Sequence, residues 1–153
     1  MDFINDAARA EAAHALIALM NPRNGGRFQP ATIGHTSCGH TFGEVIVGGT
    51  GWMRLVSVVA HAALTPYGGD DETYVRCVER DLLTRHELSR DLAGARDLVT
   101  PLAPGFKRKA VRDAILVARD HLETYSVELD MLAWELATEG TLTFDRGREL
   151  VAR

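Results

Sequence analysis

Apolar residues recur at helical spacing over most of this chain. Residues 7–20 combine Leu16, Ile17 and Leu19 with many alanines, which predicts a helix that packs closely on its neighbours. Residues 52–64 repeat the pattern, with Leu55 and the positions that follow it one helical turn apart. A second apolar helix is therefore expected there.

Two short β-prone runs separate these helices. Residues 31–33 and 41–47 are rich in Thr, Ile, Val and Phe, which favour extended backbone. The glycine-containing segment 34–39 between them is typical of a hairpin connection. The pattern predicts a small β-hairpin or short sheet after the first helix.

The second half of the chain is expected to be helical. Residues 71–95 form one predicted helix. A longer predicted helix follows, in which apolar residues recur at alternating steps of three and four. They make a narrow stripe along it: Ile115, Ala118, Leu122, Tyr125, Leu129, Leu132 and Leu136. Packing of this stripe inside the domain is favoured over a seam between copies in a homo-oligomer, which stays an alternative. Gly140 is expected to end the segment, and Thr143 or Asp145 to begin a short last helix. The predicted fold class is mainly α.

Composition narrows the class of protein. At 153 residues with 46% hydrophobic content, the chain suits one domain over residues 1–153. A net charge of -4 argues against nucleic acid as a partner, and the cationic run Lys107-Arg108-Lys109 is interpreted as a solvated helix start. Two cysteines are too few for a disulfide framework, and no apolar run reaches the ~18 to 20 residues that cross a bilayer. We expect a cytoplasmic protein that has no membrane partner.

The first predicted helix carries part of a zinc-binding motif. In a His-Glu-x-x-His helix, two histidines on one face bind zinc and the glutamate activates a water molecule. Here Glu11 and His14 stand at the second and last positions, while Ala10 occupies the position of the first histidine. A methyl group has no lone pair to donate, so this helix supplies one metal ligand instead of two.

A glycine turn offers a competing hypothesis. Residues 45–51 read as a strand that enters the turn Gly48-Gly49-Thr50-Gly51, followed by a helix, and so resemble the phosphate-binding turn of short-chain dehydrogenases. However, Arg54 stands where a third glycine is needed, and no second parallel strand is predicted downstream. A nucleotide-binding protein is therefore the less favoured hypothesis.

The order of these segments resembles the peptidase domain of FtsH-type zinc metalloproteases, without their ATPase module. The resemblance spans nearly the whole chain and is carried by Glu11 to Leu16, Ala31 to Ile33, Cys38 to Thr41, the apolar helix that follows, Gly68 to Asp71, and the helical tail from Leu129 to Leu150. It implies a helical metallopeptidase-like domain that hydrolyses peptide bonds in polypeptide substrates. The short β elements would bind the substrate by edge pairing.

The resemblance also implies roles for single residues. His14 matches the second helical zinc ligand and Glu11 the general base, while the third protein ligand is an aspartate at the start of a later helix. Asp71 is the first choice for this ligand, because the apolar spacing after it suits a helix that begins there, and Asp70 is the fallback. Either aspartate can instead serve as a helix cap or a first-turn acid.

Ala10 leaves the implied site one ligand short. Three other histidines are candidates for the missing ligand: His40 and His35 beside the sheet, and His61 on the second apolar helix. With the ligand missing, we expect less than one zinc per chain and a gain of zinc on Ala10→His. Two functions stay open, namely an impaired metallopeptidase and a catalytically inactive pseudopeptidase that binds peptides or serves in assembly.

Overall fold

The computed structural model describes residues 6–20, 31–35, 41–44 and 51–152, with the backbone alone for 31–35, 41–44 and Gly51. The chain is mainly helical and has a small sheet, as predicted. The helices in this part of the chain are α1 (Asp6–Met20), α2 (Gly51–Ala63), α3 (Asp71–Thr84), a 3₁₀ turn η2 (His86–Leu88), α4 (Ser89–Val99), α5 (Pro104–Thr124), α6 (Ser126–Glu139) and α7 (Phe144–Val151). The strands are β1 (Ala31–His35), β2 (Thr41–Glu44) and β3 (Thr141–Leu142).

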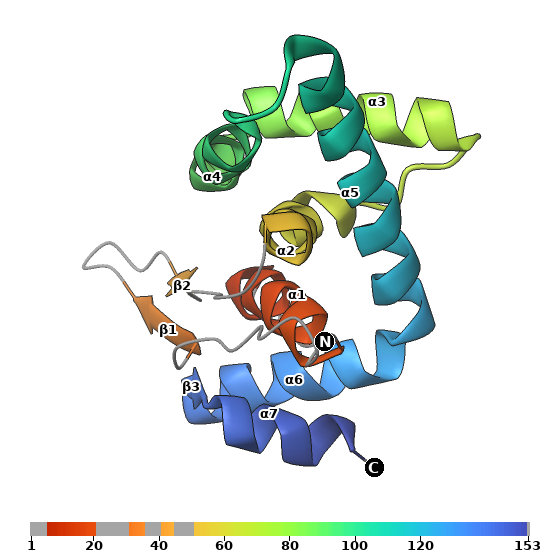
Figure 1. Cartoon of the computed structure of the whole chain (residues 1–153). Coiled ribbons are helices and arrows are strands. Elements are labelled where there is room, and N and C mark those ends of the chain that lie inside the picture. Colours follow the sequence, from red (N-terminus) through yellow and green to blue (C-terminus); the bar gives the residue numbers. More distant parts are fainter. Residues whose placement is uncertain (1–5, 21–30, 36–40, 45–50, 153) are drawn as a thin grey trace.

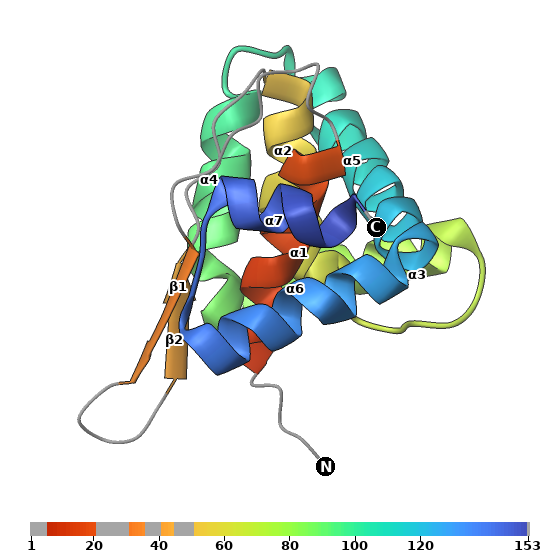
Figure 2. The ribbon, with the colours of Figure 1, turned by 90° about the horizontal axis from the view of Figure 1, so that it is seen from below.

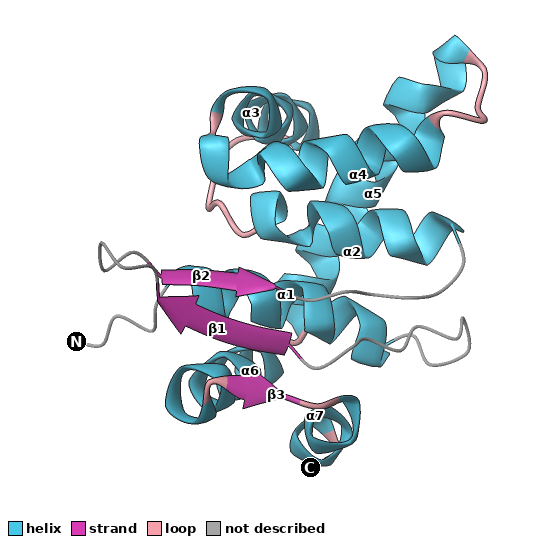
Figure 3. Cartoon of the chain, turned by 90° about the vertical axis from the view of Figure 1, so that its left-hand side faces the viewer, coloured by secondary structure: helices cyan, strands magenta, loops and turns pink. Residues whose placement is uncertain are grey.

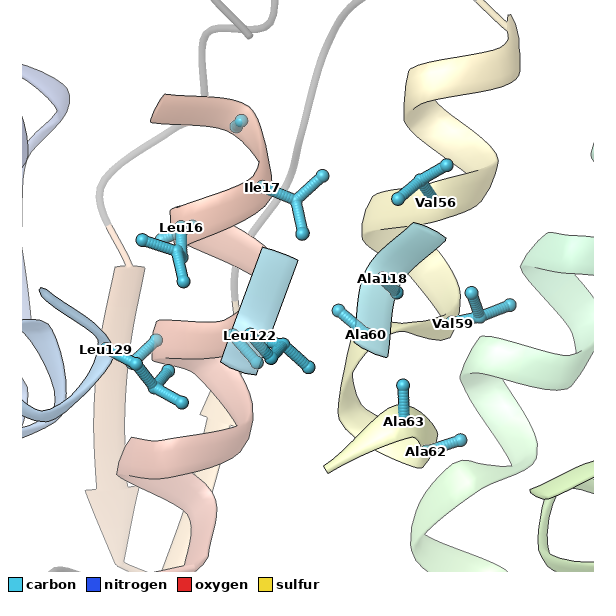
Figure 4. Packing of buried hydrophobic residues seen from close by; sticks show 14 of the residues in the cluster. Leu16, Ile17, Val56, Val59, Ala60, Ala62, Ala63, Ala118, Leu122 and Leu129 are labelled. Carbon is cyan, nitrogen blue, oxygen red and sulfur yellow. The ribbon is translucent and has the colours of Figure 1, made fainter. Parts of the chain in front are cut away.

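Helix α1 lies at the centre of the molecule, between α2 and α6 (Figure 1). Ten of its residues are buried, most of them alanines, so it has no solvent-facing stripe of the kind that a surface helix shows. Ile17 points toward Val56 of α2, and Leu16 lies beside Leu129 of α6 (Figure 4). The short alanine side chains between these contacts let the helix backbones approach closely.

The outer helices enclose this centre. Helices α4 and α5 flank α2, while α6 and α7 pass beside α1 (Figure 2). Among the described residues, no helix has both the length and the apolar character needed to span a membrane.

The three strands form one antiparallel sheet in the order β2-β1-β3. Strand β3 follows α6 and pairs Leu142 with Ala31, so the C-terminal part of the chain completes a sheet begun near the N-terminus. Strand β2 lies toward α2 and α4, whereas β3 lies toward α6 and α7 (Figure 3). Residues 45–50, with most of the predicted glycine turn, lie outside the described part, and the described strands form no parallel pair of the kind that a dinucleotide site needs.

Two segments that the pattern predicts as continuous helices are broken. The predicted helix 71–95 divides into α3, η2 and α4 because Arg85 adopts extended backbone and the chain then buries Leu88 completely. Helix α5 ends at Thr124, because the φ of -109° and ψ of 38° at Tyr125 are not helical, and α6 starts directly after Tyr125. The apolar stripe lies almost wholly in the core of the same chain, which agrees with the favoured interpretation: Ile115, Ala118, Leu122, Leu129, Leu132 and Leu136 are buried.

The predicted ends of the last helices are confirmed. Gly140 has a φ of 75° and ends α6 in the left-handed conformation that glycine adopts without strain. The Thr143 hydroxyl accepts a hydrogen bond from the backbone N–H of Arg146 and so caps α7.

Candidate metal centre

Three potential metal ligands from three helices converge beside the core. His14 comes from the middle of α1, His61 from the last turn of α2, and Asp91 from the first turn of α4. Oδ2 of Asp91 lies 3.7 Å from Nε2 of His14 and 3.6 Å from Nδ1 of His61. One ligand atom from each residue lies within 4.8 Å of the other two, a combination found nowhere else among the described residues. This set is called the His14–His61–Asp91 cluster below.

The backbone of Ser57 fixes the orientation of the His14 ring. Nδ1 of His14 lies at hydrogen-bonding distance from the Ser57 carbonyl oxygen, and the Ser57 hydroxyl donates to the His14 carbonyl oxygen at 3.0 Å. Since a carbonyl oxygen can only accept, Nδ1 of His14 carries the proton in this bond. In the neutral ring, Nε2 then has a free lone pair that points to Asp91. Metal-ligating histidines typically donate their second ring N–H to a carbonyl or carboxylate in this way.

Two of the three separations within the cluster are close to those in a tetrahedral zinc site. Zinc bonds of about 2.0 to 2.2 Å in tetrahedral arrangement place neighbouring ligand atoms about 3.4 Å apart. The observed separations of 3.6 and 3.7 Å are close to that value, yet too long for direct hydrogen bonds between the side chains. Two imidazoles and one carboxylate are the donors of several catalytic zinc sites. The side chains of His61 and Asp91 keep 18% and 19% of their surface exposed, so a further ligand can reach the cluster.

The aspartates expected at this site lie elsewhere. Asp71 is on α3, where its carboxylate accepts a hydrogen bond from Arg119 of α5 at 3.0 Å, and its side chain is 69% exposed. Asp70 caps α3 by accepting from the backbone N–H of Thr73, a bond that holds the pKa of the Asp70 carboxyl below its usual value. Neither belongs to the cluster, whose acid is Asp91, also near the start of a later helix. The alternative interpretation as cap and first-turn acid describes both residues.

The remaining predicted residues fall into three groups. Glu11 is half-buried on α1, one turn before His14, and therefore lies next to it on the helix surface. Ala10 is buried, and the second imidazole of the cluster comes instead from His61, one of the three candidates for the missing ligand. His40 lies outside the described residues, and for His35 only the backbone is described.

Two residues of the site were missed from sequence. Asp91 was placed inside a continuous helix 71–95, because no Gly or Pro marks the break before α4. A usable signal was length, since a helix of ordinary length that begins at Asp71 would end before Asp91. Ser57 carries no such signal, because its role depends on the distance between α1 and α2.

A scan against models of known families finds no match, and a search of curated proteins finds no similar sequence. The resemblance to FtsH-type peptidases therefore stays a prediction from the residues themselves. Any functional conclusion depends on the geometry of the His14–His61–Asp91 cluster.

Proposed function

We propose that this chain binds one zinc ion through His14, His61 and Asp91 and acts as a metallopeptidase on extended polypeptides. The observation that carries the proposal is the convergence of these three side chains from separate helices, with a lone pair of His14 oriented toward the centre by Ser57. The cluster includes a buried histidine whose ring is held by the Ser57 carbonyl oxygen. His14 is only 8% exposed.

In this proposal His61 supplies the ligand that Ala10 cannot. Residue 10 and His61 both lie near His14. Ala10 precedes His14 by one helical turn on α1. His61 approaches from α2, and the ring centroids of His14 and His61 are 6.3 Å apart. The site then has three protein ligands, the usual number for catalytic zinc. We accordingly replace the expectation of less than one zinc per chain by one zinc per chain.

The protein groups have separate tasks in peptide hydrolysis. Bound zinc supplies a Lewis acid that lowers the pKa of a water ligand and polarises the scissile carbonyl. The Glu11 carboxylate accepts a proton from the attacking water and returns it to the nitrogen of the leaving amine. Ser57 holds the His14 ring through its carbonyl oxygen and so keeps Nε2 available.

Strand β2 supports an extended chain as the substrate. It pairs with β1 on one side, and in the described sheet its other edge is unpaired and faces α2 and α4, which carry His61 and Asp91 (Figure 3). An extended peptide can add to such an edge through backbone hydrogen bonds, largely without regard to its side chains. It would then run beside the His14–His61–Asp91 cluster.

The test combines metal content with cleavage of an unfolded protein such as reduced casein. The wild-type chain is expected to hold one zinc and to cleave casein. Glu11→Gln should keep the zinc and lose roughly 10²- to 10⁴-fold in rate, because it removes the general base and leaves the ligands intact. Stoichiometric zinc without cleavage in the wild type would favour the inactive peptide-binding module. Absence of zinc after loading would refute the proposal.

A further inference from the structure

The turn between α4 and α5 presents two exposed apolar side chains. Leu102 is 40% exposed and Phe106 is 64% exposed. The turn projects from one end of the molecule (Figure 3), and hydrogen bonds from Leu102 N to Val99 O and from Phe106 N to Ala103 O hold its shape. No residue from 100 to 106 is charged. Residues 100–109 are called the α4–α5 tip below.

Basic residues flank these two apolar residues in the sequence. Lys107, Arg108 and Lys109 follow Phe106 directly, Arg96 precedes the turn, and the single acid between residues 96 and 109 is Asp97. This local excess of cations is opposite in sign to the chain as a whole, whose net charge is -4. The tip therefore differs in electrostatic character from the average surface of the protein.

Two of these cations, Arg108 and Lys109, are well exposed and available to an outside partner. Arg108 lies 3.7 Å from Glu79 and Lys109 pairs with Asp113, but the side chains of Arg108 and Lys109 are 70% and 67% exposed. Ion pairs between exposed side chains contribute little to stability, so Arg108 and Lys109 can leave their present partners for another anion. The long stems of Lys and Arg also let their charged ends reach away from the helix surface.

We infer that the α4–α5 tip docks on the surface of a lipid bilayer that contains anionic lipids. Leu102 and Phe106 enter the boundary between headgroups and acyl chains, while the surrounding cations contact lipid phosphates. Nucleic acid would satisfy the cations but offers no apolar phase for a leucine and a phenylalanine. A bilayer offers both within about 5 to 10 Å of its surface. This surface mode departs from our expectation of no membrane partner and needs no spanning helix.

The tip is separate from the His14–His61–Asp91 cluster. Asp91 lies in the first turn of α4, and Val99 at the end of that helix follows it by eight residues, which corresponds to about 12 Å along the helix before the tip begins. Changes at the tip are therefore expected to leave the cluster intact. The inference does not depend on the proposed function.

Vesicle sedimentation of the full chain tests the inference. The chain is expected to sediment with vesicles of phosphatidylcholine containing about a third phosphatidylglycerol, to bind pure phosphatidylcholine much more weakly, and to dissociate as salt rises. The double variant Lys107→Gln/Arg108→Gln should weaken partitioning about 30-fold, and Leu102→Ser/Phe106→Ser should abolish it. Lys107 is half-buried and the other three changed side chains are exposed, and circular dichroism checks that both variants remain folded.

A matched control comes from α6. Val127 and Trp134 are 67% and 59% exposed, so Val127→Ser/Trp134→Ser removes comparable apolar surface away from the tip. This control should bind vesicles like the wild type. Equal binding by the tip variants and the wild type, or no binding to anionic vesicles at low salt, would overturn the inference; in the second case an acidic protein becomes the partner to seek.

Discussion

Replacement of His61 by alanine should weaken zinc binding without unfolding the chain. The His61 side chain is 18% exposed at the end of α2 and lies outside the apolar core cluster, and the Tm of the metal-free variant measures any effect of its removal on folding. The cluster would keep His14 and Asp91, and Ser57 would still hold the His14 ring. The effect on metal affinity can therefore be separated from an effect on folding.

The size of the effect follows from the number of ligands. Structural zinc sites with four protein ligands contribute about 10 to 16 kcal/mol, so one ligand corresponds to about 3 kcal/mol, or roughly 10²-fold in dissociation constant. At a zinc concentration 100 times the wild-type dissociation constant, binding stabilises the folded chain by about 2.7 kcal/mol. For a chain of this size that raises the Tm by about 5 to 10 °C. The same zinc concentration only equals the dissociation constant of His61→Ala, because that constant is about 100 times larger than in the wild type. Zinc should therefore raise the Tm of this variant by about 1 °C.

The assay is thermal unfolding with and without zinc, together with zinc affinity from competition with a chromophoric chelator. His86→Ala is the matched control, because His86 is an exposed histidine outside the cluster. It should respond to zinc like the wild type. The reasoning is refuted if zinc raises the Tm of His61→Ala as much as that of the wild type, or if His86→Ala loses the response.

Three further predictions concern the site and the fold. Ala10→His should add no zinc to the wild-type background but should restore zinc binding to His61→Ala, since residue 10 lies one turn before His14; elemental analysis of both variants decides this. Leu129→Ala should lower the free energy of unfolding by about 2 to 5 kcal/mol in urea titrations, because Leu129 is 1% exposed in the core; an unchanged value would contradict the packing of α6 on α1. Asp70→Ala should lower the Tm at neutral pH by removing the cap of α3. That difference should vanish as pH falls through the lowered pKa of Asp70, below 3.8, and a difference that persists in stronger acid would contradict the cap.

Local signals predicted most of the fold. The alanine-rich α1, the apolar α2, the cap at Thr143 and the left-handed Gly140 depend on nearby residues, and each was found close to its predicted place. The breaks at Arg85 and Tyr125 were missed because neither is a glycine or proline. At the first break, burial of Leu88 against the other helices outweighs the helical pattern. Such tertiary contacts are not encoded in a short window of sequence.

In the candidate site, too, the residues marked by local sequence signals were predicted and those placed by tertiary contacts were not. His14 and Glu11 were found because their spacing on one helix is itself a motif. Asp91 and Ser57 were not, because the distances that give them their roles join α1 to α2 and α4. His61 could be named only as one of several candidates until the packing of α2 on α1 was known.

Zinc content of two aspartate variants tests the central claim most directly. Each purified chain is loaded with zinc, dialysed and measured by elemental analysis. The wild type and Asp71→Ala should each retain one zinc, because Asp71 lies outside the cluster and pairs with Arg119, whereas Asp91→Ala should retain far less. Full zinc in Asp91→Ala together with loss in Asp71→Ala would contradict the account and return the third ligand to α3.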